Sequence, residues 1–148
     1  MSRERVILVP HDFGEPADDA LEMALFLGPK LDVMIVLLHI YEPPNAAYPL
    51  APFPMIDVVP ALAKASEAGI DALVTRTKER WEKTRGLVRS GKPWREILEA
   101  ARELQAEMIV MGTAGHRGIE RALLGSVAEK VVRSSEIPVI TVHHRHTS

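Results

Sequence analysis

Three glycines and a serine in the last third of the chain have the spacing that a phosphate-binding loop needs. Gly112 and Gly115 enclose two residues, nine more separate Gly115 from Gly125, and Ser126 follows directly. Because glycine has no Cβ, such a loop can turn sharply and bring its backbone close to phosphate oxygens. The pattern therefore predicts a phosphate-binding site and, with it, a bound nucleotide.

The segments on either side of this loop are the ones that such a site requires. The apolar run 108–111 is suited to a buried parallel strand, and 126–133 has the periodicity of a helix. Gly125, Ser126 and Val127 would then lie at a helix amino terminus, where unpaired N–H groups and the helix dipole favour an anion. Two other phosphate motifs are absent: no lysine follows Gly125 as in a P-loop, and no Gly-x-Gly-x-x-Gly follows the first apolar run.

Composition narrows the class of protein. The 148 residues are 47% hydrophobic and 26% charged, which fits one soluble domain over 1–148. A formal net charge of -2 gives no excess that would attract nucleic acid or an anionic membrane, so we expect neither as a partner. The absence of cysteine excludes disulfides and thiol catalysis and fits a cytoplasmic protein. The first apolar run, 6–9, is too short for a signal peptide.

Strand-like apolar segments alternate with segments of helical periodicity along the chain. This alternation is typical of an α/β fold, in which helices cover both faces of a parallel sheet. We predict a single-domain, open, five-stranded parallel sheet of the nucleotide-binding, Rossmann-like kind. The strands are expected at 6–9, 34–40, 86–88, 108–111 and 139–142. We expect one helix after Pro16, a second after Pro60, a third after Pro93 and a fourth over 126–133. One face of the second helix would carry Ile70, Leu73, Val74, Thr77 and Trp81.

A proline-rich stretch separates the second strand from the second helix. It contains Pro43, Pro44, Pro49, Pro52 and Pro54. Proline has no N–H to donate and does not continue a helix or a central strand. We therefore predict a long surface loop over 43–60 that acts as a lid or as an interface.

Open α/β sheets bind ligands at the carboxyl ends of their strands. Residues 10–14, 40–42 and the glycine loop all follow such ends. The carboxylate of Asp12 would lie there, as an acceptor for ribose hydroxyls or as a contact to a phosphate-bound cation. The alternative is that Asp12 caps a helix or solvates its loop.

The chain resembles the universal stress protein family in several motifs that occur in the same order. The similar segments are 7–13, 37–40, 90–98, 108–113, 123–128 and 137–139. The resemblance covers nearly the whole chain apart from the proline-rich loop and the tail. One branch of that family binds ATP and carries Gly-x2-Gly-x9-Gly-[Ser/Thr], which Gly112, Gly115, Gly125 and Ser126 match in full.

The resemblance implies a role for each matching position. Asp12 would face the ribose, the main chain of Ile40 the adenine edge, and the loop from Gly112 to Gly115 the ribose and phosphates. Gly125, Ser126 and Val127 would hold the phosphates. Pro10, His11 and Met111 would form the walls. The family often has a small polar residue at the position of His11, serine at Gly14, and histidine or serine at Ala114, so the adenosine side departs from its pattern.

Several other residues invite a chemical role. His116 and Arg117 would contact the triphosphate, or else they are solvated loop residues. His143, His144 and His146 suggest a metal site, but a terminal tail seldom brings three rings together, so we assign no metal ligand. We expect His39 to be a satisfied interior or strand-end histidine, and Trp81 and Trp94 to be packing residues. We assign no catalytic residue.

Three functions follow. The first is an ATP-binding, nucleotide-dependent regulatory protein of the stress response, acting on an unknown protein partner. The alternatives are a slow ATPase or adenylate-transferring enzyme, and a nucleotide-free interaction protein. A fast hydrolase needs a positioned base near the phosphates, and Glu120 is the only carboxylate in the loop. ATP, ADP, AMP and cyclic AMP all remain open as the ligand, with Mg²⁺ or Mn²⁺ bound through the phosphates.

The last predicted strand suggests the oligomeric state. The side chains of residues 139–142 would alternate between the two faces of the sheet. The strand would lie at an edge of the sheet, where an unpaired apolar edge tends to be covered. Members of the similar family commonly pair through this strand. We therefore expect a two-fold homodimer through the carboxyl-terminal strand.

Overall fold

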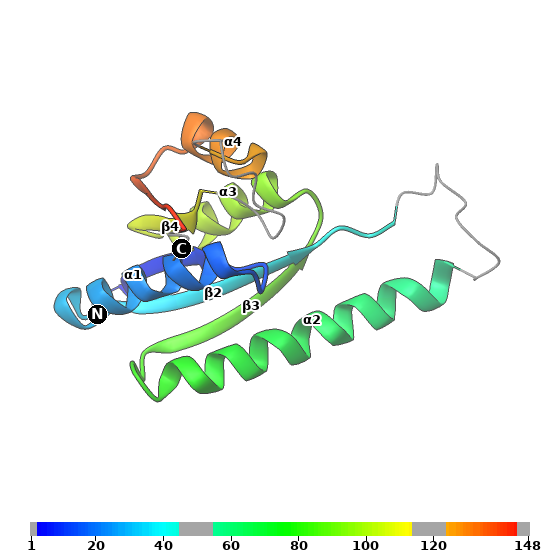
Figure 1. The fold of residues 1–148 in the computed structure, drawn as a ribbon, viewed down its shortest axis with the longest axis horizontal. Helices are drawn as coiled ribbons and strands as arrows, with labels where there is room; N and C mark the ends of the chain where they lie inside the picture. Colours follow the sequence, from blue (N-terminus) through cyan, green and yellow to red (C-terminus); the bar gives the residue numbers. More distant parts are fainter. Residues whose placement is uncertain (1–2, 45–54, 114–123, 145–148) are drawn as a thin grey trace.

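The computed structural model describes residues 3–44, 55–113 and 124–144, and over these ranges strands and helices alternate (Figure 1). The strands are β1 (Val6–Pro10), β2 (Met34–Tyr41), β3 (Thr84–Ser90), β4 (Met108–Gly112) and β5 (Val139–Val142). The helices are α1 (Glu15–Leu31), α2 (Met55–Lys78), α3 (Pro93–Leu104) and α4 (Ser126–Ser134). None of these helices is long and apolar enough to cross a membrane.

The five strands form one parallel sheet in the order β3-β2-β1-β4-β5. β1 lies at its centre, and the side chains from Val6 to Val9 are at most 1% exposed. Strands that are buried on both faces need continuous apolar runs rather than alternating ones. This requirement is why the runs of the sequence could be recognised, and the predicted fold class is confirmed.

The helices cover the sheet in two layers. Successive residues of a strand point to opposite faces, so Ile7 packs with α1 and α2 while Leu8 packs with α3 and α4. The first layer is completed by residues such as Ala24 and Ile70, and the second by residues such as Val131. Figure 1 shows α3 and α4 on one side of the strands and the long α2 on the other.

The prediction of a loop over 43–60 is wrong at its carboxyl end. α2 already begins at Met55, so Pro60 lies inside a helix. The exposed Pro60 removes only one backbone hydrogen bond near the start of a long helix. The apolar face that continues to Leu73 compensates for this loss. Residues 45–54, which carry most of the predicted loop, lie outside the described residues.

The second helix also ends earlier than predicted. The backbone N–H groups of Arg80 and Trp81 both donate to the carbonyl of Thr77, and α2 stops at Lys78. Trp81 therefore does not belong to the helix face on which we placed it. Its ring Nε1 donates to the carbonyl of Val33 at 2.8 Å, which ties the α2–β3 turn to the start of β2. β3 extends over seven residues, Thr84–Ser90, rather than the three predicted.

Two glycines at the contacts of α2 provide a matched test of this packing. A Cβ at Gly86 would collide with Cγ2 of Ile70 and lie 3.0 Å from Cγ2 of Val74, both in the core. We expect Gly86→Ala to lower the free energy of unfolding by about 1–3 kcal/mol through overpacking. A Cβ at Gly69 would meet only the ring of Phe13, which is 41% exposed and can move.

Gly69→Ala is therefore the control for Gly86→Ala. Alanine is the better helix former, so we expect a stability equal to wild type or higher by up to about 1 kcal/mol. Urea denaturation followed by circular dichroism measures both variants. Equal losses in the two would show that α2 packs on β3 less closely than described.

Candidate functional site

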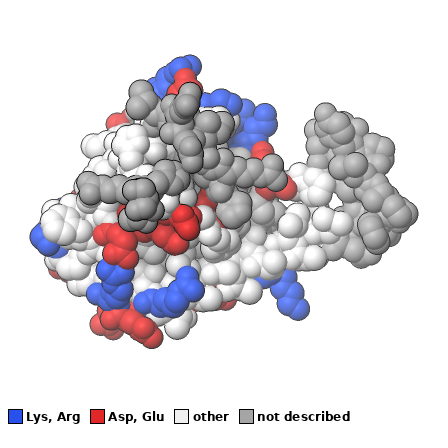
Figure 2. All heavy atoms as spheres, in the orientation of Figure 1, with Lys and Arg blue, Asp and Glu red and all other residues white. Residues whose placement is uncertain are grey.

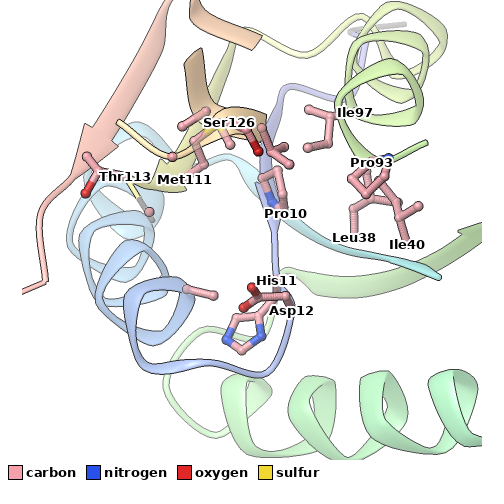
Figure 3. A pocket seen from close by; sticks show the side chains of 15 residues that line it. Pro10, His11, Asp12, Leu38, Ile40, Pro93, Ile97, Met111, Thr113 and Ser126 are labelled. Atoms are coloured by element: carbon pink, nitrogen blue, oxygen red, sulfur yellow. The ribbon is translucent and has the colours of Figure 1, made fainter. Parts of the chain in front are cut away.

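A cavity of about 200 Å³ lies at the carboxyl ends of β1, β2 and β4, between the first turns of α3 and α4 (Figure 3). Nine of the predicted site residues line it: Pro10, His11, Asp12, Ile40, Met111, Gly112, Gly125, Ser126 and Val127. The structure thus brings together segments that are about a hundred residues apart in sequence. The predicted residues Gly115, His116 and Arg117 lie outside the described residues.

Sequence analysis missed six residues that also line the cavity. They are Ala17, Leu38, Pro93, Ile97, Thr113 and Ala128. Some of them had a usable signal. Leu38 is two residues before Ile40 on the same strand, and Ile97 is one turn after Pro93 on the same helix. Figure 3 shows Leu38, Ile40, Pro93 and Ile97 grouped on one side of the cavity, where they form an apolar wall.

The other side of the cavity is the amino terminus of α4. The carbonyl of Gly125, the N-cap residue, accepts the N–H of Glu129 at 2.9 Å, the first bond of the helix. The N–H groups of Ser126, Val127 and Ala128 precede that bond and have no acceptor within the helix. All three residues line the cavity. Unpaired donors at the positive end of a helix dipole make this wall suited to an anion.

Backbone bonds hold this helix terminus against the sheet. The N–H of Gly125 donates to the carbonyl of Thr113, the residue after β4. The N–H of Thr113 in turn donates to the carbonyl of Val142 at 3.1 Å. The start of α4 is therefore connected through the end of β4 to the end of β5.

The two described glycines of the loop have different roles. A Cβ at Gly112 would lie 2.7 Å from the carbonyl oxygen of Pro16, so this glycine allows the first turn of α1 to pack against β4. Gly125 has φ -70°, which any residue adopts, so its backbone conformation does not demand glycine. The sequence pattern predicts a tight turn and a close approach to a ligand for the loop, with Gly125 at the helix amino terminus. For Gly112 the observed constraint is packing against the protein itself.

Asp12 uses one of its two carboxylate oxygens for a hydrogen bond within the protein. Its Oδ1 accepts the N–H of Gly14 at 3.0 Å and so shapes the loop that leads from β1 into α1. Gly14, rather than Asp12, is the N-cap residue, so the alternative interpretation of Asp12 as a helix cap is wrong. The carboxylate is exposed, and among the described residues Oδ2 has no hydrogen-bond partner.

The His11 ring is bonded on both nitrogens to the protein. Nε2 donates to Oδ1 of Asp18 at 2.9 Å, and Nδ1 accepts the N–H of Phe13 at 3.0 Å. This pair of bonds requires the neutral ring, since a protonated Nδ1 cannot accept. His11 is 4% exposed, and this burial lowers its pKa below the ordinary value in spite of Asp18, whose carboxylate raises it. The ring therefore organises the loop, and its nitrogens are not available to a ligand.

His39 is a satisfied strand-end histidine, as the sequence suggested. Its Nδ1 donates to the carbonyl of His11 at 2.8 Å, which links β2 to the β1–α1 loop. The ring of Phe13 lies 4.4 Å from that of His39, centroid to centroid. Phe13 has φ +67°, an unfavourable conformation for a side chain of this kind. The hydrogen bond from its backbone N–H to His11 holds this backbone conformation in place.

The histidines after β5 contact different groups. Nδ1 of His143 lies 3.4 Å from Oγ1 of Thr113, whereas His144 contacts Asp19 at 2.5 Å and Glu15 at 3.0 Å. The hydrogen bond that His144 donates to Asp19, followed by the charges of Asp19 and Glu15, raises the pKa of His144 above its ordinary value. Within the described ranges no three histidine or carboxylate side chains group as a metal site, and His146 lies outside them.

A parallel sheet with a cavity at the carboxyl ends of its central strands defines an open α/β protein, a class in which ligands commonly bind at this edge of the sheet. The family model described as "Universal stress protein family" matches residues 4–143, and the chain belongs to this family. Universal stress protein MJ0531 of Methanocaldococcus jannaschii is 32% identical over 145 residues, covering 92% of this chain and 80% of that protein.

Solved structures agree on the fold. The structure of MJ0577, from the same archaeon, has a TM-score of 0.83 at 23% identity and covers 99% of this chain and 100% of its own. A universal stress protein solved in complex with cAMP has a TM-score of 0.69 at 21% identity, covering 97% of this chain and 100% of that one. At these identities the likeness shows the fold alone.

The contacts of His144 predict a pH dependence of stability. Because the folded state raises its pKa above 6.5, His144 stabilises the fold fully below pH 6.5, and this contribution is lost as the pH rises through the raised pKa. The difference in unfolding free energy between wild type and His144→Gln should therefore be largest below pH 6.5 and shrink above it. Denaturant unfolding across a pH series measures the difference.

The control is His143→Gln, which leaves the contacts of His144 with Asp19 and Glu15 intact. It should keep the pH profile of the wild type. The opposite contribution of His11, whose pKa is lowered, is present in all three proteins and cancels in the comparison. A difference for His144→Gln that is constant with pH would contradict a charged His144.

Proposed function

We propose that this protein binds an adenine nucleotide, ATP first among them, and that occupancy regulates its contacts in a cytoplasmic stress response. The observation that carries the proposal is the cavity itself. On one side, Ser126, Val127 and Ala128 offer three N–H groups that the helix leaves unpaired. On the other side lies the apolar wall of Leu38 and its neighbours. A nucleotide has an anionic end and a flat apolar base that match these two sides.

Each part of the nucleotide has a place in this arrangement. The N–H groups and the Ser126 hydroxyl would bind the phosphates. The base would lie against Leu38 and Ile97, with the main chain of Ile40 at its edge. Oδ2 of Asp12, on the loop between the two sides, would accept a ribose hydroxyl. Mg²⁺ or Mn²⁺ would accompany the phosphates without a named protein ligand.

Two observations support this choice of ligand. The relative solved with cAMP contains an adenine nucleotide on the same fold. The full spacing of Gly112, Gly115, Gly125 and Ser126 resembles the ATP-binding branch of the family. The first supports an adenine nucleotide in general, and the second supports ATP in particular.

The described cavity favours binding over hydrolysis as the activity. Among its described lining residues the ionisable side chains are those of His11 and Asp12. His11 is neutral and bonded on both nitrogens, and Asp12 uses one oxygen for its own loop. A hydrolase needs a base that is free to orient water near the phosphates, and neither residue fits that role. We therefore propose no catalytic residue.

The nucleotide site is tested by identifying what the purified protein carries. We expect ATP or ADP to be released on denaturation and identified by chromatography and mass spectrometry, because the cavity sequesters its ligand. Gly125→Val places a branched side chain at the mouth of the phosphate wall, so it should lose the nucleotide and bind added ATP with magnesium at least about tenfold more weakly. Ser134→Val, at the exposed far end of the same helix, should behave as wild type.

Two outcomes would contradict the proposal. One is a wild type that releases nothing and shows no thermal shift with ATP and magnesium, which would favour the nucleotide-free interaction protein. The other is a Gly125→Val variant that folds and retains the nucleotide. Release of ADP alone, with ATP bound on addition, would support the site and point to slow hydrolysis.

We also propose that the protein forms a two-fold homodimer through β5, which lies at an edge of the described sheet. The carbonyl of Pro138 accepts a hydrogen bond from Ile109 of β4, and that of Val142 accepts one from Thr113, the residue after β4. Because backbone groups alternate in direction along a strand, the N–H and C=O of Thr141 point toward the open edge. These groups are available to a second copy of the strand.

Thr141→Pro therefore removes an edge donor without breaking the β4–β5 ladder. We expect a folded monomer by light scattering after size exclusion, with the circular dichroism of wild type. Val142→Pro is the comparison, since its N–H faces β4 and its loss should destabilise the fold itself. A Thr141→Pro protein that remains dimeric would place the interface elsewhere.

A further inference from the structure

Trp94 lies between two cations that come from different helices. The guanidinium carbon of Arg95 is 5.2 Å from the centroid of the Trp94 ring, and Nζ of Lys130 is 5.6 Å from it. Trp94 is on α3 and Lys130 is on α4, so the ring bridges the outer surfaces of the two helices. The ring is half-buried, and both cationic side chains are exposed. This combination leaves an aromatic face with fixed positive charges beside it.

The cations of this surface have no ion-pair partner among the described residues, as is also true of Lys64 and Arg76 on α2. Six lysines and arginines elsewhere pair with carboxylates: Arg5, Arg80, Lys83, Arg85, Arg89 and Arg133. Among the described residues, Lys92, Arg95, Arg102 and Lys130 have no carboxylate within ion-pair distance. Figure 2 shows lysine and arginine side chains gathered where Figure 1 places the first turns of α3 and α4.

A second cavity continues the same surface. It has a volume of about 400 Å³ and lies between the carboxyl ends of α3 and α4. Leu98, Ala101 and Ile137 give it apolar walls, and Arg102 lies at the cavity together with Arg3. Arg95, Leu98 and Arg102 follow one another at helical spacing, so about 10 Å of helix separates the two arginines. An extended chain crosses that distance in three residues.

We propose that this α3/α4 surface, made of Lys92, Trp94, Arg95, Leu98, Arg102 and Lys130, binds an acidic segment of a partner protein. Carboxylates three residues apart would meet Arg95 with Lys130 at one end and Arg102 at the other. An apolar side chain between them would enter the cavity beside Leu98. The four cations would then obtain the partners that the described residues do not provide.

The apolar cavity is the reason for choosing a protein segment over other anions. A nucleic-acid backbone or a lipid headgroup would match the cations but has nothing to place against Leu98, Ala101 and Ile137. Glu136 lies at the same cavity and would repel a phosphate placed there, whereas the apolar side chain of the proposed segment would not be repelled. The overall net charge of -2 also disfavours long-range attraction of a polyanion.

This surface is separate from the nucleotide cavity. Trp94, Arg95, Arg102 and Lys130 do not line that cavity, although Pro93 and Val127 beside them do. The inference therefore stands whether or not a nucleotide binds. The two proposals can fail independently.

The probe is a short fluorescein-labelled peptide with glutamates three residues apart and a leucine between them. We expect saturable binding to the full-length protein by fluorescence anisotropy, weakening as salt is added. Arg95→Glu combined with Lys130→Glu should weaken binding at least about tenfold. Lys64→Glu combined with Arg76→Glu makes the same charge change on exposed, unpaired positions of α2 and should bind within about twofold of wild type.

Further measurements separate a specific surface from a general charge effect. The peptide should change the intrinsic tryptophan fluorescence of wild type but not of Trp94→Phe, which leaves Trp81 as the remaining tryptophan. Replacing the leucine of the peptide by serine should weaken binding, because the cavity is then unfilled. Equal loss in both charge-reversal variants, no saturable binding of the peptide, or tighter binding of an oligothymidine or of phosphatidylserine vesicles would overturn the proposal.

Discussion

The arrangement of the protein depends on where the chain reverses its course across the sheet. From the central β1 the chain moves outward to β2 and β3, and it then crosses back to place β4 on the other side of β1. At that point the loops after β1 and β4 diverge from each other, and the helices that follow them begin on opposite sides of a gap. The cavity is a consequence of this order, and most of the residues that line it follow or end a strand, or begin a helix.

Most of the fold could be predicted because a strand that is buried on both faces of the sheet appears in the sequence as a continuous apolar run. The runs 6–9, 34–38 and 108–111 are apolar throughout, since a polar residue on either face would be desolvated without a partner. The predictions that were wrong depend on distant contacts or on the length of a helix, which the local sequence does not show. Trp81 has the spacing of a helix residue, but its bond to Val33 places it in a turn. Pro60 looks like a helix breaker, yet it is tolerated because the helix around it is long.

The glycines show a second limit of prediction from sequence. Gly112 and Gly125 belong to one spacing pattern, and the pattern alone gives them one explanation. In the structure Gly112 faces the backbone of Pro16, whereas Gly125 begins a helix with an ordinary φ. The first is constrained by the protein, so its replacement acts on folding. The second lines the cavity, so its replacement acts on the shape of that cavity. The spacing pattern does not separate these cases, because it records only where the glycines occur.

In the β1–α1 loop, His11 holds the site in shape without adding a positive charge to it. Asp12 is the carboxylate of the cavity, and a charged imidazolium on the residue before it would compete with a ligand for it. His11 avoids this because burial favours its neutral form, and that form satisfies Asp18 with one nitrogen and Phe13 with the other. A positive charge on the ring would cost the bond to Phe13, whose left-handed backbone depends on it. The same burial that stabilises the loop therefore leaves the negative charge of Asp12 uncompensated by His11 and directed at the cavity.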